Sequence, residues 1–142
     1  MRRSLALALA VFLGGGEAAN AGCAIGLIGS VNLSASATGA ASTVSASITT
    51  SSGTLTYLTR IMVSGGGATA ASVVNGTITG VVGAPLNFAV PVPAGATAGL
   101  TPVILDFSSC PLQGSTVNGT ITVSVPSFGA GNTLADLTIT GF

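Results

Sequence analysis

The sequence contains no histidine, no lysine and no tryptophan, and its 142 residues include only three arginines and three acidic residues. Without histidine or lysine, the side chains that most often transfer protons near neutral pH, or that form covalent amine adducts, are missing. A surface that binds nucleic acid needs several basic side chains on one face, which this chain cannot provide. We therefore expect neither an enzyme nor a nucleic-acid-binding protein, and we expect no cofactor.

Half of the few charges lie near the N-terminus, as Arg2, Arg3 and Glu17. The two arginines are followed by an apolar stretch at 5–13 and by Ala-Asn-Ala at 19–21. This order of a basic, an apolar and a small-residue segment is typical of a secretory signal peptide cleaved after residue 21. It predicts an extracellular, cell-surface or virion-surface location. The alternative is that residues 1–21 form an N-terminal arm retained in the mature protein.

The remaining residues, 22–142, have the length of a single domain. The mean hydropathy of the whole chain is high, at +0.83. Beyond residue 21, however, serine, threonine, glycine or asparagine interrupts every apolar run before it reaches the roughly 20 residues of a membrane span. Hydroxyls and amides must therefore form the polar surface. Such a weakly charged surface repels its neighbours little, which suits a subunit of a larger assembly.

Alternation of apolar and polar residues is the main secondary-structure signal after the leader. It is clearest in 31–37 and 44–49, and it indicates strands buried on one face. Runs rich in β-branched residues and bounded by glycine or proline predict six more strands, at 54–63, 72–82, 86–92, 102–107, 116–125 and 134–140. About eight short strands without an amphipathic helix predict an all-β fold, an antiparallel two-sheet sandwich or jelly roll.

A short repeat relates two of these segments, because 72–79 and 115–122 both contain Asn-Gly-Thr-Ile-Thr. We interpret the repeat as equivalent strands of the two sheets. Asn-Gly is a strong turn dipeptide, yet here it is followed by a strand-like sequence. Each copy is therefore expected to be a hairpin tip or a strand bulge.

The two cysteines, Cys23 and Cys110, are expected to form a disulfide. An even number of cysteines in an exported chain that has no histidine for a metal site favours a bridge over a metal or a catalytic thiol. If the protein instead stays in a reducing cytoplasm, both are expected to be buried free thiols.

Two carboxylates, Asp106 and Asp136, are the only acidic side chains after the leader. A pair of carboxylates can perform acid/base chemistry. The alternation of each strand, however, places both at solvent-facing positions, so we expect solvated carboxylates, one of them paired with Arg60. They are too few for a dedicated calcium site, and we expect no metal.

From residue 57 onward, the chain contains a series of characteristic turn and strand segments. They are Tyr-Leu-Thr-Arg-Ile-Met-Val-Ser at 57–64, Pro-Val-Pro-Ala-Gly at 91–95, Leu-Asp-Phe at 105–107, Cys-Pro-Leu at 110–112, Ser-Phe-Gly-Ala-Gly-Asn-Thr at 127–133 and Thr-Gly-Phe at 140–142. This pattern resembles small β-sandwich proteins encoded in tailed phages and prophages. The resemblance implies a structural component of the virion surface, of the decoration type, that associates with a larger shell.

A second hypothesis is an exported pilin-like or filament subunit that polymerises by strand addition. Its assembly strand would lie in residues 25–37, with Ile25, Leu27, Val31 and Leu33 as the apolar side chains that enter a neighbouring copy. A third and weaker alternative is a carbohydrate-binding module. Such modules stack sugars on exposed aromatic rings, whereas this chain has no tryptophan and one tyrosine.

Overall fold

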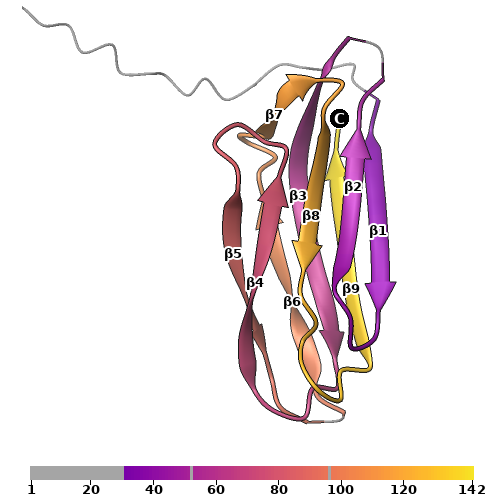
Figure 1. Ribbon diagram of the computed structural model, residues 1–142, viewed down its shortest axis with the longest axis vertical. Coiled ribbons are helices and arrows are strands. Elements are labelled where there is room, and N and C mark those ends of the chain that lie inside the picture. The colour runs from indigo at the N-terminus through magenta and orange to yellow at the C-terminus, as the bar shows by residue number, and fades with distance from the viewer. Residues whose placement is uncertain (1–30, 52, 96) are drawn as a thin grey trace, which may run out of the picture.

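All the helices or strands that the described residues form are β-strands. The computed structural model describes residues 31–142 except 52 and 96, and these residues form nine strands in two antiparallel sheets that pack face to face (Figure 1). The all-β, two-sheet prediction is confirmed. The strands are β1 (Leu33–Gly39), β2 (Val44–Thr49), β3 (Leu55–Gly66), β4 (Ser72–Thr79), β5 (Leu86–Val92), β6 (Gly99–Asp106), β7 (Leu112–Val117), β8 (Thr120–Val125) and β9 (Leu134–Gly141).

The order of the strands is that of a jelly roll. Sheet A has the order β1-β9-β3-β6, with β7 as an additional partner of β3, and sheet B has the order β2-β8-β4-β5. With β7 set aside, the first strand pairs with the last, the second with the second-last, the third with the third-last, and the two middle strands with each other. This is the arrangement of a long hairpin rolled into two sheets.

Period-two alternation fills the space between the sheets. In β2, for example, Val44, Ala46 and Ile48 are buried while Ser45 and Ser47 are exposed. The same alternation in the other strands directs β-branched and aliphatic side chains inward, where removal of apolar surface from water stabilises the fold. The largest fully buried apolar side chains are Phe128, Leu58, Ile61, Ile121, Leu137, Ile139, Val63, Val90, Val123 and Val125.

A bulge in β3 changes which residues face the core. Leu58 pairs with Gly141 and Arg60 pairs with Thr140, so Thr59 is an extra residue on β3. Leu58 and Ile61 are therefore both buried although they lie three positions apart. The Thr59 hydroxyl donates a hydrogen bond to the carbonyl oxygen of Thr140 at 3.0 Å. The bulge turns Arg60 outward, as bulges commonly re-aim a side chain.

The strand β7 closes one end of the sandwich. It pairs with the start of β3, and it also reaches the loop after β4, where the N–H of Val82 donates to the carbonyl of Gln113 and that of Ser115 donates to the carbonyl of Gly80. Backbone groups at this end are thereby paired within the chain.

The region predicted as one strand at 116–125 is two strands in different sheets, so that prediction is wrong. The chain turns at Asn118-Gly119, where Asn118 has a φ of 57° and Gly119 N–H donates to the Thr116 carbonyl at 3.0 Å. The turn carries the chain from β7 in sheet A to β8 in sheet B. It is therefore a crossover between sheets, and neither a hairpin tip nor a bulge.

The other Asn-Gly lies in the middle of β4, in unbroken register with β5, so it too is neither a tip nor a bulge. Gly76 lies opposite Phe88, and a Cβ at position 76 would collide with the Phe88 ring. Glycine is needed here for the close approach of an aromatic side chain. The repeat does not mark equivalent strands of two sheets, because β4 and β8 are neighbours in sheet B.

Candidate functional site

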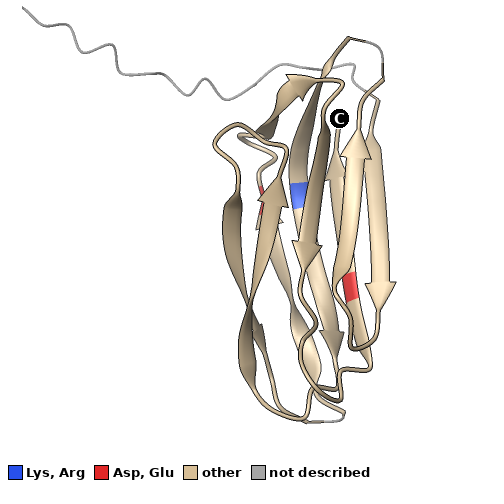
Figure 2. Cartoon of the chain, in the orientation of Figure 1, with Lys and Arg blue, Asp and Glu red and all other residues tan. Residues whose placement is uncertain are grey.

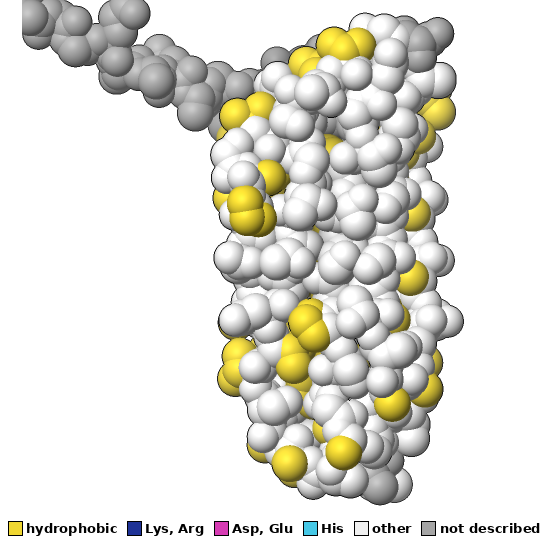
Figure 3. All heavy atoms as spheres, in the orientation of Figure 1, with side chains coloured by type: hydrophobic (Ala, Val, Ile, Leu, Met, Phe, Trp, Pro, Cys, Tyr) yellow, Lys and Arg dark blue, Asp and Glu magenta, His cyan; other side chains and the backbone are white. Residues whose placement is uncertain are grey.

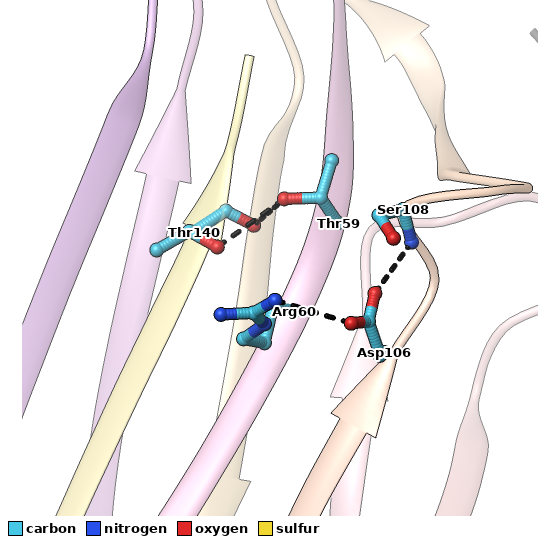
Figure 4. Close-up of polar contacts among 5 residues, drawn as sticks. All are labelled: Thr59, Arg60, Asp106, Ser108 and Thr140. Carbon is cyan, nitrogen blue, oxygen red and sulfur yellow. Dashed lines mark hydrogen bonds and ion pairs between the residues drawn. The ribbon is translucent and has the colours of Figure 1, made fainter. Parts of the chain in front are cut away.

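The described charged residues lie on sheet A. Figure 2 shows how sparse they are. Arg60 of β3 lies directly opposite Asp106 of β6, and its Nη2 lies 3.1 Å from Asp106 Oδ2 (Figure 4). Both side chains are about half exposed, at 54% and 44%. The expected pairing of Arg60 with an aspartate is thus observed, and an ion pair this exposed contributes little to stability.

Asp106 is held in its ionised form. Hydrogen bonds from Ser108, first from its hydroxyl and then from its backbone N–H, together with the Arg60 guanidinium, lower the pKa of Asp106 from 3.8 to about 2. The backbone bond is 2.8 Å long and fixes the turn that follows β6. A carboxylate with this pKa stays ionised near neutral pH, so it cannot act there as a general acid.

We predict that the Asp106 carboxyl titrates near pH 2 in the folded protein, as measured by NMR. Ser108→Ala and Arg60→Ala should each raise its pKa toward 3.8, because each removes a group that favours the ionised form. Because the folded state favours the ionised form, the resulting contribution to stability is complete above pH 3.8 and is lost as the pH falls through about 2. A wild-type midpoint near 3.8 would contradict the assignment.

The second carboxylate lies far from the first. Asp136 is half-buried on β9, opposite Ser64 of β3, whereas Asp106 lies on the other side of β3, opposite Arg60. Positions 60 and 64 are about 13 Å apart along a strand. Paired carboxylates in glycoside hydrolysis lie roughly 5–10 Å apart. Asp106 and Asp136 are therefore not placed as an acid/base pair, and Asp136 is partly covered rather than fully solvated.

Within residues 31–142, apart from the two omitted positions, no three histidine, cysteine, aspartate or glutamate side chains gather as a metal-ligand cluster. In the same residues, no helix of sufficient length and hydrophobicity to cross a bilayer occurs.

The expected disulfide remains a prediction. Cys110 lies in the turn between β6 and β7, where its N–H donates to the carbonyl of Phe107 at 2.9 Å. Cys23 lies outside the described residues, as does the leader at 1–21. Intact mass after alkylation without reductant should show no modified thiol. Two alkylated cysteines in the unreduced native protein would contradict the bridge.

The expected assembly strand is described only in part. Ile25 and Leu27 lie outside the described residues, and Val31 is 78% exposed and precedes β1. Leu33 begins β1, where it pairs with Gly141 of the same chain. Residues from Leu33 onward thus complete the protein's own sheet, so a test of strand donation must leave β1 intact.

The outer face of sheet B carries a ladder of hydroxyl pairs that the sequence analysis missed. Between β2 and β8, each exposed serine or threonine is hydrogen-bonded to the residue directly opposite, at 2.7–2.8 Å. The hydroxyl ladder comprises the pairs Ser45–Ser124, Ser47–Thr122 and Thr49–Thr120. The period-two hydroxyls in 45–49 and 120–124 were the available signal.

Figure 3 shows the face on which β2, β8 and β4 lie nearest the viewer. It is covered mainly by backbone and by side chains that are neither hydrophobic nor charged, with scattered hydrophobic side chains among them. Cross-strand hydroxyl pairs of this kind stabilise a sheet modestly, each by about 0.2–1 kcal/mol. The larger consequence is a face with little electrostatic repulsion toward another surface.

A shallow depression of about 330 Å³ lies where β3 ends. Backbone at Gly65, Gly66 and Gly67 forms much of it, with Ser64, Thr133 and the Asp136 side chain nearby. No aromatic side chain is among the described residues that line it. It therefore lacks the stacking platform expected of a carbohydrate-binding module.

Comparison of the chain with known protein families, with curated proteins and with solved structures finds no match. Its class therefore follows from its fold and surface: a jelly-roll sandwich whose described faces are nearly uncharged and rich in hydroxyls. The resemblance to virion-surface proteins of phages stays a prediction.

Proposed function

We propose that this protein is a non-enzymatic structural subunit of a virion-surface or extracellular assembly, which works by packing against copies of itself or against a larger shell. The observation that carries the proposal is the outer face of sheet B. The exposed hydroxyls of β2 and β8 are paired with each other there, and the chain supplies almost no charge to oppose contact between copies. Such a face suits association better than it suits proton transfer or binding of an ionic ligand.

The placement of the charged groups also supports this proposal. Arg60 and Asp106 neutralise each other, and Asp136 lies on a separate part of sheet A, opposite Ser64. The proposed location follows from the signal-like leader, and the phage-type resemblance supports a virion rather than a filament.

The test is the size of the secreted or leader-free chain, residues 22–142, measured by light scattering after gel filtration and by negative-stain microscopy. We expect dimers or larger assemblies, or binding to a shell. A strictly monomeric protein that forms no assembly at any concentration, or one that turns over a substrate, would contradict the proposal.

Strand donation by the N-terminal segment is a separate arm of this test. A deletion of residues 24–31 keeps both cysteines and all of β1. Polymerisation that requires this segment would favour the pilin-like alternative, whereas unchanged assembly would favour the virion-type subunit.

A further inference from the structure

The two open sides of the sandwich differ in how their edge strands are protected. One side is formed by β5 and β6, and the other by β1 and β2 (Figure 1). The first side carries Pro91 in β5 and Pro102 in β6. Proline lacks an N–H and blocks the addition of a strand. β1 and β2 contain neither proline nor a charged residue, so they lack these protections.

Of these two unprotected edges, β2 is the one whose outward hydroxyls form cross-strand pairs with the neighbouring strand. The inward residues of β2 are Val44, Ala46 and Ile48, all buried in the core. In β1 two of the three inward residues are alanine, and the strand ends at Gly39. Because the inward residues of β2 are already buried, pairing along β2 would gain chiefly main-chain hydrogen bonds and further hydroxyl pairs that continue the hydroxyl ladder.

The sequence of β2 is complementary to itself in the antiparallel sense. When Ser47 lies opposite Ser47 of a second copy, Ser45 lies opposite Thr49, and Ala46 lies opposite Ile48. Every outward pair then joins two hydroxyls, as β2 already does with β8. On the inward face Ala46 lies opposite Ile48, a small residue against a large one, and Val44 lies opposite Thr50, which follows β2. Cross-strand pairs of these types stabilise a sheet, and a two-fold axis through position 47 satisfies both copies equally.

We propose that two copies of this protein pair through β2, antiparallel and with Ser47 at the two-fold axis, so that their B sheets become one continuous sheet. The strand added at the β2 edge is β2 of a second copy, because its outward and inward side chains are complementary to those of the first copy and it adds no charge. This inference rests on the proposed function, since it specifies the first contact of the self-association proposed above.

The test uses opposite charges at position 47. Ser47→Lys and Ser47→Glu each place like charges face to face across the axis, and each should weaken dimerisation roughly a hundredfold. An equimolar mixture of the two variants should restore the dimer, because lysine then lies opposite glutamate. Ala89→Lys, on the proline-bearing edge strand β5, is the matched control and should leave the dimer unchanged. Sedimentation velocity measures the association, and circular dichroism verifies that each variant is folded.

The outcomes separate this interface from the proposed function. Association that persists in both Ser47 variants, or is lost only in Ala89→Lys, overturns pairing through β2 but leaves a structural role in place. If association is lost when residues 24–31 are deleted but is unaffected by the substitutions at position 47, the N-terminal segment is the strand that occupies the β2 edge. That result also overturns pairing through β2 of a second copy. If the folded Ser47→Lys and Ser47→Glu variants stay monomeric when they are mixed, the register that places Ser47 opposite Ser47 is overturned. A wild-type protein that forms no assembly overturns both proposals.

Discussion

Replacement of Gly80 by alanine should destabilise the protein by about 3–5 kcal/mol. Gly80 follows β4 with a φ of 79°, a conformation that costs an L-residue about 1–2 kcal/mol. The added Cβ would also collide with the backbone carbonyl oxygen of Thr120. That carbonyl belongs to the first residue of β8, which is held by pairing with Thr49 of β2. A backbone carbonyl in a strand that is paired with its neighbour cannot move aside as the end of a flexible side chain can.

Gly83 provides the matched control, because it has the same φ of 79° but no atom within 4 Å of an added Cβ. Gly83→Ala should therefore lower the free energy of unfolding only by the cost of the positive φ, about 1–2 kcal/mol. Urea denaturation of both variants gives the two free energies of unfolding, and their difference isolates the collision at Thr120. Equal losses of unfolding free energy in the two variants would show that β8 shifts away from the added Cβ at little cost.

Asn132→Asp is expected to have a comparable effect, of about 4 kcal/mol at neutral pH. Asn132 is 4% exposed and holds three parts of the chain together. Its Nδ2 donates to the carbonyls of Gly66 and Leu134, both at 2.8 Å, and its Oδ1 accepts from the N–H of Ala41 at 3.3 Å. An aspartate would present an oxygen to two carbonyl oxygens, so both carbonyls would lose their donor and would face a buried negative charge.

Asn132→Ala separates these contributions. It removes the two bonds donated to Gly66 and Leu134, and also the bond from Ala41 that an aspartate can keep, but it introduces no charge, and it should cost about 2–3 kcal/mol. Protonation of an aspartate at 132 restores a donor toward one carbonyl. The stability of Asn132→Asp should therefore recover, relative to that of Asn132→Ala, as the pH is lowered toward 4. Thermal unfolding across this pH range measures the difference, and parallel curves for the two variants would contradict the proposed orientation of the amide.

The fold class was predictable because the alternation of apolar and polar residues lies within the sequence of each single strand. The bounds of 44–49 and 86–92 agree with β2 and β5, since both strands are flanked by turn residues. The break between β7 and β8 was not predictable in the same way. Apolar Val117 continues the alternating pattern, and only the positive φ of Asn118 reveals the turn. Likewise, nothing in the residues around Gly76 shows that Phe88 lies above it.

The candidate site was less predictable, because it depends on which distant strands are neighbours. The sequence left open which aspartate pairs with Arg60, since the choice follows from the position of β6 beside β3. The hydroxyl ladder depends on pairing between Ser47 and Thr122, 75 residues apart. Alternation identifies which residues face outward, but it does not identify their partners in the next strand.

The hydroxyl ladder has one further property. In each of its three bonds either oxygen can be the donor, because a hydroxyl can rotate and offers both a proton and lone pairs. A carboxylate or a guanidinium has a fixed role, whereas a row of hydroxyls can reverse direction without moving a heavy atom. The face of sheet B can therefore adapt its hydrogen-bonding polarity to an arriving surface, and two identical faces can meet without a mismatch of donors and acceptors.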